Sequence, residues 1–443
     1  MGSVANAAPT PARRRVELRR QLATTPGRLR LAAALLALSA IVFGAVAARA
    51  AGERRDAVRS VAATESLLVS AVKLSASLSN THAIAAFSFL RGRPERAQSR
   101  RLYDDEMQQA SVGVANLARE IGTPSGSAPA VRRITQTLPV YAGLVENARA
   151  NNRQGFPVGS AYLRKASKTM RNGMLPAARD LYKIAAQHLT TSYRAGVSSA
   201  AMFAVVLAGC TMLMLLAQTQ IYLARTTRRI LNPGLVVATA LLLGLLVWIV
   251  VAFTVQQSAL AEAHAKGSDP VELLTTTRIL ASRAQADESI ALAARGGGEE
   301  EPRLRDVDRG FQAVTRPIKR LLEQARAIAG DASASSNAIE GAYRTYLEAH
   351  SRVVEQVRVG DFTKAVQLAV ERGTDGSPST KRAGDALDEA LDREVGIAQG
   401  RFDDAAARAD SALHGLAVGI PALTVLCALL ALFGVRQRLE EYR

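Results

Sequence analysis

Cysteine is scarce in this chain, with Cys210 and Cys427 the only two among 443 residues. Both lie inside apolar runs, so the long polar segments between those runs contain no disulfide. Packing of apolar side chains must therefore hold these segments together. We expect both thiols to be small packing residues in the lipid phase, and the alternatives are a redox role or palmitoylation.

Recognisable catalytic motifs are also missing. The sequence has no glycine-rich phosphate loop followed by Lys and Ser, no paired metal-ligand histidines and no nucleophile elbow. Its five histidines are scattered, and the acidic run Glu299–Glu301 after three glycines is more typical of a solvated loop than of a metal site. We therefore predict that the protein is not an enzyme and carries no cofactor or metal.

Aromatic residues make up only 5% of the chain, although its formal net charge is +17. The positive charge is divided between a short amino-terminal tail and one large segment. Arginines next to an apolar run act first as topology determinants and as partners of anionic lipid. We expect membrane lipid, and not nucleic acid, as a binding partner.

Charged residues are absent from four apolar runs that are each about as long as the roughly 20 residues a membrane-crossing helix needs. A carrier usually has ionisable groups at membrane depth, so their absence disfavours a solitary transporter. The first run could be a cleaved signal peptide ending near Ala48-Arg49-Ala50, but it is longer than a typical signal core. We predict transmembrane helices at residues 31–50, 197–223, 234–255 and 415–435.

Basic residues near these helices predict the orientation of the chain. The tail 1–30 has a charge of +6, and the short elbow 224–233 has a charge of +3. The positive-inside rule places both in the cytoplasm, together with the tail 436–443. We therefore expect a multi-pass plasma-membrane protein with both termini inside and two large extracytoplasmic segments, 51–196 and 256–414.

These two large segments differ in charge. Residues 51–196 have a net charge of +11, and residues 256–414 have a net charge of −5. The two could attract each other or present a divided surface to a third protein. Compositional drift without a function is an equal alternative.

Helical periodicity is strong in both large segments. Val131, Ile134, Leu138, Tyr141 and Val145 step by three and four, as a bundle-facing stripe does. The second segment has two further apolar stripes. The first consists of Leu304, Val307, Phe311, Val314, Ile318, Leu321, Ala325 and Ile328, and the second of Ile339, Ala342, Tyr346, His350, Val353 and Val357.

Breaker clusters divide each segment into four helices, and these landmarks recur at a nearly constant offset. The turn at Arg91-Gly92 returns at Arg295-Gly296, 204 residues later, and Gly155 returns as Gly360 after 205. We therefore predict an all-α integral membrane protein in which four transmembrane helices carry two tandem extracytoplasmic four-helix bundles related by internal duplication. His350 on a core stripe is expected to be a satisfied interior residue, with a ligand or pH-sensing role as the alternative.

Partner contacts are expected at the ends of the helices. Output must pass through a separate protein, because no effector domain follows the last apolar run. The candidate cytoplasmic contacts are Arg225, Arg228, Arg229, Arg436, Arg438 and Tyr442. The candidate extracytoplasmic contacts are Arg91, Arg93, Arg153, Phe156, Arg295, Glu299, Asp361 and Phe362.

Five stretches of the sequence resemble a known group of proteins. They are Thr25–Arg30, His82–Gly92, Tyr103–Glu106, Leu163–Pro176 and Ala284–Gly296. Over nearly its whole length the chain resembles the actinobacterial four-span membrane proteins of the GlnX type. That resemblance implies two partners: an extracytoplasmic glutamine-type solute-binding lipoprotein and the soluble serine/threonine kinase G. The expected bundles also resemble the four-helix sensor modules of chemoreceptors, in fold only.

Helices that run from an outer bundle through the bilayer can transmit a small shift to the inner face. Together with the resemblance, this predicts a signalling adaptor that relays amino-acid availability from a solute-binding protein to a serine/threonine kinase. The adaptor could also assemble as a homo-oligomer. Two alternatives stay open. The chain could bind a small ligand directly, or it could be an accessory or structural subunit of a transport or envelope complex.

Overall fold

The computed structural model describes residues 25–91, 97–120, 127–155, 158–196, 199–227, 232–293, 304–329, 334–371, 373 and 376–440. Within these residues the chain is helical and contains no strand. The α-helices are α2 (Thr25–Arg91), α3 (Ala97–Glu120), α4 (Ala128–Gln154), α5 (Val158–Thr169), α6 (Leu175–Gly196), α7 (Ser199–Thr227), α8 (Pro233–Ala263), α9 (Asp269–Ala293), α10 (Leu304–Ala329), α11 (Ala334–Arg358), α12 (Phe362–Val370), α13 (Thr380–Ala412) and α14 (Leu416–Glu440). Two π-helical turns interrupt this series, η1 (Met170–Met174) and η2 (His264–Ser268).

The chain divides into two compact units, which are described separately below. The span unit comprises residues 1–59, 194–260 and 407–443. The bundle unit comprises residues 60–193 and 261–406, and we call these two ranges its first half and its second half. Both large polar segments thus contribute to one compact unit.

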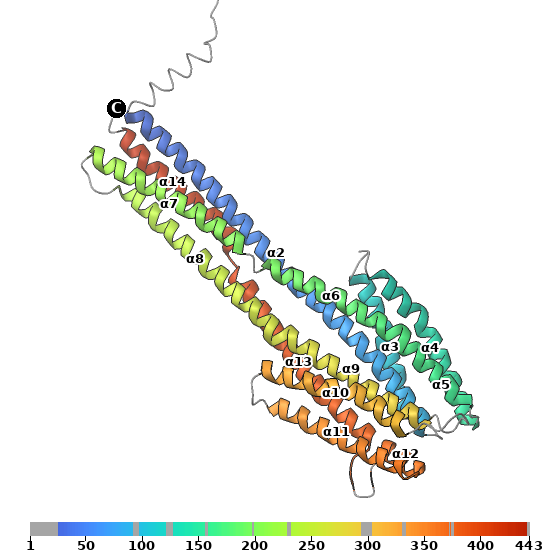
Figure 1. Ribbon diagram of the computed structural model, residues 1–443. Coiled ribbons are helices and arrows are strands. Elements are labelled where there is room, and N and C mark those ends of the chain that lie inside the picture. The colour runs from blue at the N-terminus through green and yellow to red at the C-terminus, as the bar shows by residue number, and fades with distance from the viewer. Residues whose placement is uncertain are drawn as a thin grey trace, which may run out of the picture. The chain divides into compact units, whose positions relative to one another are not determined.

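The span unit consists of the first part of α2 together with α7, α8 and α14 (Figure 1). Each of these helices belongs to a stretch that is long and apolar enough to cross a membrane. Large apolar side chains point outward, and Phe203, Leu207 and Val418 are at least 70% exposed. Such a surface is unfavourable in water, whereas hydrocarbon solvates it. The four helices agree with the four predicted transmembrane segments.

Small residues bring the helices of the span unit close together. A Cβ atom on Gly209 would lie 2.4 Å from Leu246, and one on Gly419 would lie 2.6 Å from Trp248. Close packing of this kind replaces the hydrophobic effect as the cause of helix association in lipid. Cys427 is buried and its Sγ donates to the carbonyl of Ala238 at 3.2 Å, while Cys210 is exposed. The packing role expected for the cysteines is thus confirmed for Cys427.

A buried arginine lies among these helices. Arg54 of α2 is only 2% exposed. Its Nη1 donates to Gln256 Oε1 at 2.6 Å, and its guanidinium carbon lies 4.2 Å from the centroid of the Phe253 ring. Gln256 donates in turn to the carbonyl of Gly196 at 3.3 Å. Arg54 is therefore part of the packing and not a free surface charge.

The expectation of uninterrupted helices holds for α2 and for the stretch Pro233–Ala293, and it fails between α13 and α14. Helix α2 runs without a break from Thr25 to Arg91. The π-helical turn η2 joins α8 to α9 without a gap, whereas three residues, 413–415, separate α13 from α14. Gly415 takes a φ of +81° in that gap, a left-handed conformation that ends helices and favours glycine. Residues 197 and 198, between α6 and α7, lie outside the described residues.

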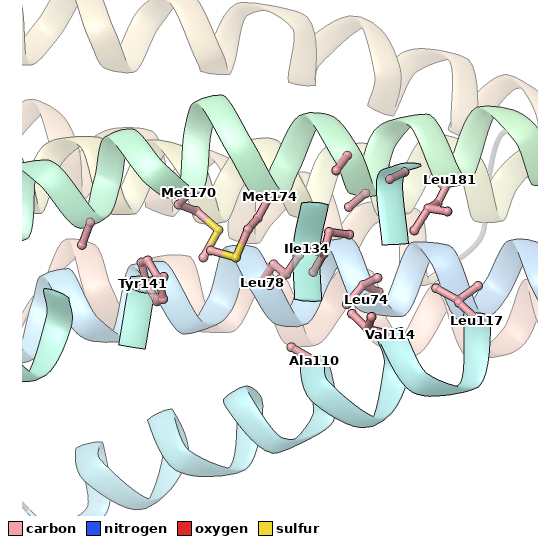
Figure 2. Close-up of a cluster of buried hydrophobic side chains, with 14 of the residues drawn as sticks. Leu74, Leu78, Ala110, Val114, Leu117, Ile134, Tyr141, Met170, Met174 and Leu181 are labelled. Carbon is pink, nitrogen blue, oxygen red and sulfur yellow. The ribbon is translucent and has the colours of Figure 1, made fainter. Parts of the chain in front are cut away.

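The first half of the bundle unit encloses a core built from α2, α3, α4 and the helix formed by α5, η1 and α6. The predicted stripe on α4 faces this core, since Ile134, Tyr141 and Val145 are at most 1% exposed. Met170 and Met174 point from η1 into the cluster that contains Tyr141 and Ile134 (Figure 2). The π-helical turn η1 ends at Met174, two residues before Pro176.

The second half encloses its own core, built from α9, α10, α11 and α13. The stripe on α11 is buried as predicted at Ile339, Tyr346, His350, Val353 and Val357, and Ala342 is partly buried. On α10 the predicted stripe steps alternately by three and four residues, as a heptad does, and it is wrong at its carboxyl end, because Ile328 is 36% exposed and Leu322, not Leu321, packs on the core. The side chains of Leu304 and Val307 at its other end lie outside the described residues. A straight helix has 3.6 residues per turn, so a stripe with a strict period of 3.5 drifts off the buried face.

The two halves also pack on each other. Phe87 of α2 joins a third cluster with Leu292 of α9, Val353 of α11 and Ala369 of α12. Ser282 of α9 donates to Asn80 of α2 at 2.8 Å. The sequence left open whether the two segments touch, and within the bundle unit they do.

Candidate ligand-binding site

The predicted cytoplasmic contact residues are only partly described. Arg225 near the end of α7 and Arg436 near the end of α14 are exposed. Arg228, Arg229 and Tyr442 lie outside the described residues, and so does the side chain of Arg438. The structure does not bring Arg225 and Arg436 into a defined site.

The predicted extracytoplasmic contacts are likewise scattered. Arg153 is exposed at the end of α4. Asp361 and Phe362 have structural roles: Asp361 caps α12 by accepting from the Lys364 amide at 2.9 Å, and Phe362 packs against the third cluster. The remaining positions, Arg93, Phe156, Arg295 and Glu299 and the side chain of Arg91, lie outside the described residues.

A cavity of about 330 Å³ lies inside the bundle unit, where α6 and η1 of the first half meet α9 of the second half beside α2. We call it the α6/α9 cavity. Its walls are mixed, with apolar and basic side chains. The lining residues are Val72, Ser75, Arg171, Leu175, Pro176, Arg179, Tyr182, Lys183, Glu272, Thr275, Thr276, Ile279, Leu280 and Arg283.

Two of the four cations that line this cavity are already paired. Arg171 Nη1 lies 3.0 Å from Asp287 Oδ1, and Arg283 Nε lies 3.6 Å from the other oxygen of the same carboxylate. Burial raises the pKa of Asp287, and the two guanidinium groups oppose that shift. Asp287 thus anchors Arg171 and Arg283 across the junction between the halves.

The other two cations have no such partner. Arg179 and Lys183 are exposed on α6, and no ion pair joins either of them to the residues that the structure describes. They are four residues apart, so they lie on the same face of the helix. Their charge is available to an anion in the cavity.

Polar groups complete the lining. Thr275 on α9 is 2% exposed, and its hydroxyl has no hydrogen-bond partner within the described part of the chain. An unsatisfied buried hydroxyl is unfavourable, so a ligand that bonds to it is stabilised. Burial raises the pKa of the Tyr182 phenol, and the neighbouring Glu272 carboxylate raises it further. The cavity therefore offers two free cations, one carboxylate and, at Thr275 and Tyr182, two hydroxyl groups that lack a hydrogen-bond partner within the described residues.

Sequence reasoning missed this site. Arg171, Arg179 and Lys183 are spaced by eight and four residues, which does place them on one helical face. That signal does not reveal which other helix the face meets. The searched residues hold no group of His, Cys, Asp or Glu that could bind a metal ion.

Residues 56–194 match the actinobacterial sensor domain. The matched segment covers the whole of the first half of the bundle unit, including eight of the residues that line the α6/α9 cavity. No curated protein and no solved structure matches the chain. The match supports a sensing or signalling role for an actinobacterial sensor protein. Together with four helices long and apolar enough to span a bilayer, it indicates a membrane protein.

Proposed function

We propose that this chain is a membrane sensor that binds a small carboxylate-bearing solute, such as an amino acid, in the α6/α9 cavity. The observation that carries the proposal is a cavity with two unpaired cations, Arg179 and Lys183, in the segment that matches a sensor domain. Direct ligand binding was the second hypothesis from the sequence, and it required a pocket between helices with a few convergent polar groups.

The lining fits a zwitterion. Arg179 and Lys183 would hold a carboxylate, and Arg179 can do so with two parallel hydrogen bonds. Glu272 would accept from an ammonium group, and the Thr275 hydroxyl would bond to either end of the ligand. A volume of about 330 Å³ is at the small end of ligand pockets, which suits an amino acid better than a nucleotide.

Signalling would follow from the helices that form the cavity. A ligand that contacts α6 and α9 together stabilises the packing in which both reach it, and so shifts the population toward that packing. In the chain, α6 precedes the apolar helix α7, and α9 follows the apolar helix α8 through η2. A shift of either helix therefore acts on a segment that leads directly into a candidate membrane span.

The proposed orientation is the one that the charges favour. Residues 1–30, 224–233 and 436–443 would face the cytoplasm, and the bundle unit would lie outside. The relay from a solute-binding protein to a serine/threonine kinase stays a prediction in this scheme, as does a homo-oligomer. Exposed Arg153 on one side and exposed Arg225 and Arg436 on the other are compatible with such partners.

We also propose that the two halves arose by duplication. Ile134 and Ile339, Tyr141 and Tyr346, and Gly155 and Gly360 are each 205 residues apart; both tyrosines are fully buried and both glycines have positive φ. Hydrogen bonds within the bundle unit join residues 202 or 203 apart, Asn80 to Ser282 and Glu65 to Ser268. Residues near a two-fold axis meet their own counterparts, so these bonds support a pseudo-two-fold relation.

A thermal-shift experiment tests the ligand proposal. Full-length protein in detergent is heated with glutamate, glutamine, aspartate or succinate, and with cadaverine as a dication of similar size. We expect at least one carboxylate compound to raise Tm and cadaverine to have no effect, because binding to the folded state alone adds stability. Absence of any shift with all four carboxylate compounds would contradict the proposal.

Variants locate the site. Replacing Arg179 and Lys183 together by Ala should weaken the binding at least tenfold, whereas Arg132→Ala, an exposed arginine on α4, should leave it unchanged. If the shift requires a loaded solute-binding protein and does not respond to the free solute, the adaptor hypothesis replaces direct sensing.

A further inference from the structure

A second cavity lies wholly within the second half of the bundle unit, between α9, α10, α11 and α13. Its volume is about 380 Å³. No residue of the segment that matches the sensor domain lines it. We call it the α10/α11 cavity, and it shares no lining residue with the α6/α9 cavity.

The charged group of interest in this cavity is Glu394 on α13. The residue is 5% exposed, and its Oε2 has no hydrogen-bond partner within the described part of the chain. Its other oxygen lies 3.8 Å from Arg401 Nη1, which is an ion-pair distance but too long for a hydrogen bond. A buried carboxylate oxygen that lacks a donor is unfavourable, so a ligand that supplies one gains that energy.

The other charges at the cavity are already matched. Arg326 and Arg344 lie 3.1 and 3.3 Å from the carboxylate of Glu340, and Lys319 lies 3.9 Å from Glu323. The basic side chains that line the cavity thus each face a carboxylate. An anion that entered would find no unpaired cation, while a cation would find Glu394.

The rest of the wall is apolar. Leu274, Leu322, Ile339 and Leu347 contribute aliphatic surface. The ring of Tyr343 also lines the cavity, and its hydroxyl donates to the carbonyl of Thr315 at 3.1 Å, so the phenol needs no bond from a ligand. Such walls favour a ligand whose body is a hydrocarbon and disfavour a strongly hydrated ion.

We propose that the α10/α11 cavity is a binding site for a small organic amine with an apolar body. The protonated amine donates to Glu394 Oε2, and the hydrocarbon part packs against Leu322 and Ile339. A metal ion is the poorer occupant, because one carboxylate cannot supply the several oxygen ligands that hard cations require. The site is separate from that of the proposed solute, and it gives the sensor a second input.

Calorimetric titration of the full-length protein with cyclohexylamine tests this assignment. Cyclohexanol serves as a probe of the same shape without charge, and cyclohexanecarboxylate as the probe of opposite charge. We expect saturable binding of the amine alone. Equal binding of the alcohol would show that the cavity only takes up hydrocarbon, and no binding of the amine would overturn the proposal.

Two variants assign the binding to this cavity. Glu394→Gln should lower the affinity for cyclohexylamine at least tenfold, and Glu389→Gln, an exposed position on the same helix, should leave it unchanged. If Glu394→Gln does not fold, Leu347→Trp fills the cavity from its rim without altering the carboxylate and should also abolish binding. Unchanged binding in the tryptophan variant would overturn the proposal.

The Arg179→Ala and Lys183→Ala double variant separates this inference from the proposed function. It should retain amine binding while it loses the response to carboxylates. Failure of one site therefore does not entail failure of the other.

Discussion

The two halves of the bundle unit each bury one histidine, and they surround it with different chemistry. In the first half, His82 Nδ1 lies 3.2 Å from the Tyr141 hydroxyl and Nε2 lies 3.2 Å from the Ser167 hydroxyl. Burial lowers the pKa of His82 to about 3, and the charge of Arg171 acts in the same direction. This histidine is neutral at physiological pH, and its partners are neutral too.

In the second half the buried imidazole faces a carboxylate. His350 Nδ1 is bonded to Glu288, whose side chain is fully buried, and the ring stacks on Phe311 with centroids 3.4 Å apart. Tyr346, the counterpart of Tyr141, is also fully buried. Burial raises the pKa of Tyr346, with the Glu288 carboxylate as the next cause. The second core therefore contains an ionisable pair where the first contains hydroxyl groups.

This difference teaches that a shared helical plan does not determine the electrostatics of a core. Removing one member of a neutral hydrogen-bonded pair lowers the stability of the fold by a modest amount, because only an uncharged hydroxyl is left without its partner. A buried carboxylate that loses its partner is left as an uncompensated charge. The two halves should respond unequally to equivalent substitutions.

The largest effect is expected from His350→Leu. It leaves Glu288 buried without its imidazole partner and should lower the free energy of unfolding by about 4 kcal/mol. His82→Leu should cost about 2 kcal/mol, because only bonds to hydroxyl groups are lost. Thermal unfolding of the full-length protein compares the two variants, with His188→Leu, an exposed position, as control. Equal losses for His82→Leu and His350→Leu would remove the distinction between the cores.

The next effect is the pH dependence that His82 contributes. Above pH 6.5 the imidazole is neutral in both states. As pH falls from 6.5 toward 3, the unfolded chain takes up a proton that the folded chain does not, so stability is lost by up to about 1.4 kcal/mol per pH unit. The difference in stability between wild type and His82→Gln, measured from pH 7 to pH 5, should therefore shrink as the pH falls. A difference that stays constant would show that His82 titrates normally.

Glu65 should give the opposite slope at the junction between the halves. Its carboxylate accepts from Ser268 at 3.1 Å, and burial raises its pKa to about 7, with Asp403 adding to the shift and Ser268 and His264 opposing it. The folded chain therefore keeps a proton that the unfolded chain loses as pH rises from about 4.5 to 7. The stability present below pH 4.5 is lost over that window.

Replacing Glu65 by Gln removes this loss. At pH 8 the variant should be more stable than wild type by about 3 kcal/mol, and near pH 4.5 the two should be equal. Chemical unfolding at the two pH values is the measurement. A variant that is less stable at pH 8 would show that the ionised carboxylate is satisfied by its neighbours.

The smallest effect is expected at the start of α12. Asp361→Ala removes the side chain that accepts from the Lys364 amide, and loss of such a cap costs about 1 kcal/mol. Asp361→Asn retains an acceptor and should recover most of that stability. If Asp361 is instead a partner contact, the alanine variant will keep its Tm and lose the partner.

Much of the helical core could be read from the sequence. The predicted stripes include four side chains that are fully buried: Ile134 and Tyr141 on α4, and Tyr346 and Val353 on α11. Burial of one face of a helix places apolar residues about every 3.6 positions, and this pattern can be seen in a short stretch of sequence. The same reasoning failed at Ile328, where a heptad was extended beyond the buried face.

The candidate sites could not be read in this way. The sequence pattern did not indicate that Asp361 caps α12, that Arg54 is buried, or that either cavity exists. Arg171 and Asp287, which meet at 3.0 Å, are 116 residues apart in the chain. No local pattern in the sequence relates two such positions.

The sequence by itself therefore determined that this protein is helical and carries four apolar helices, because hydrocarbon solvation and one-sided burial act on neighbouring residues. Only the tertiary structure decided which helical faces meet. That choice leaves Arg179 and Lys183 unpaired beside one cavity and Glu394 unsatisfied beside another. Charges pair according to distances that are set when helices remote in the sequence pack together. The pairing is therefore known only from the three-dimensional structure.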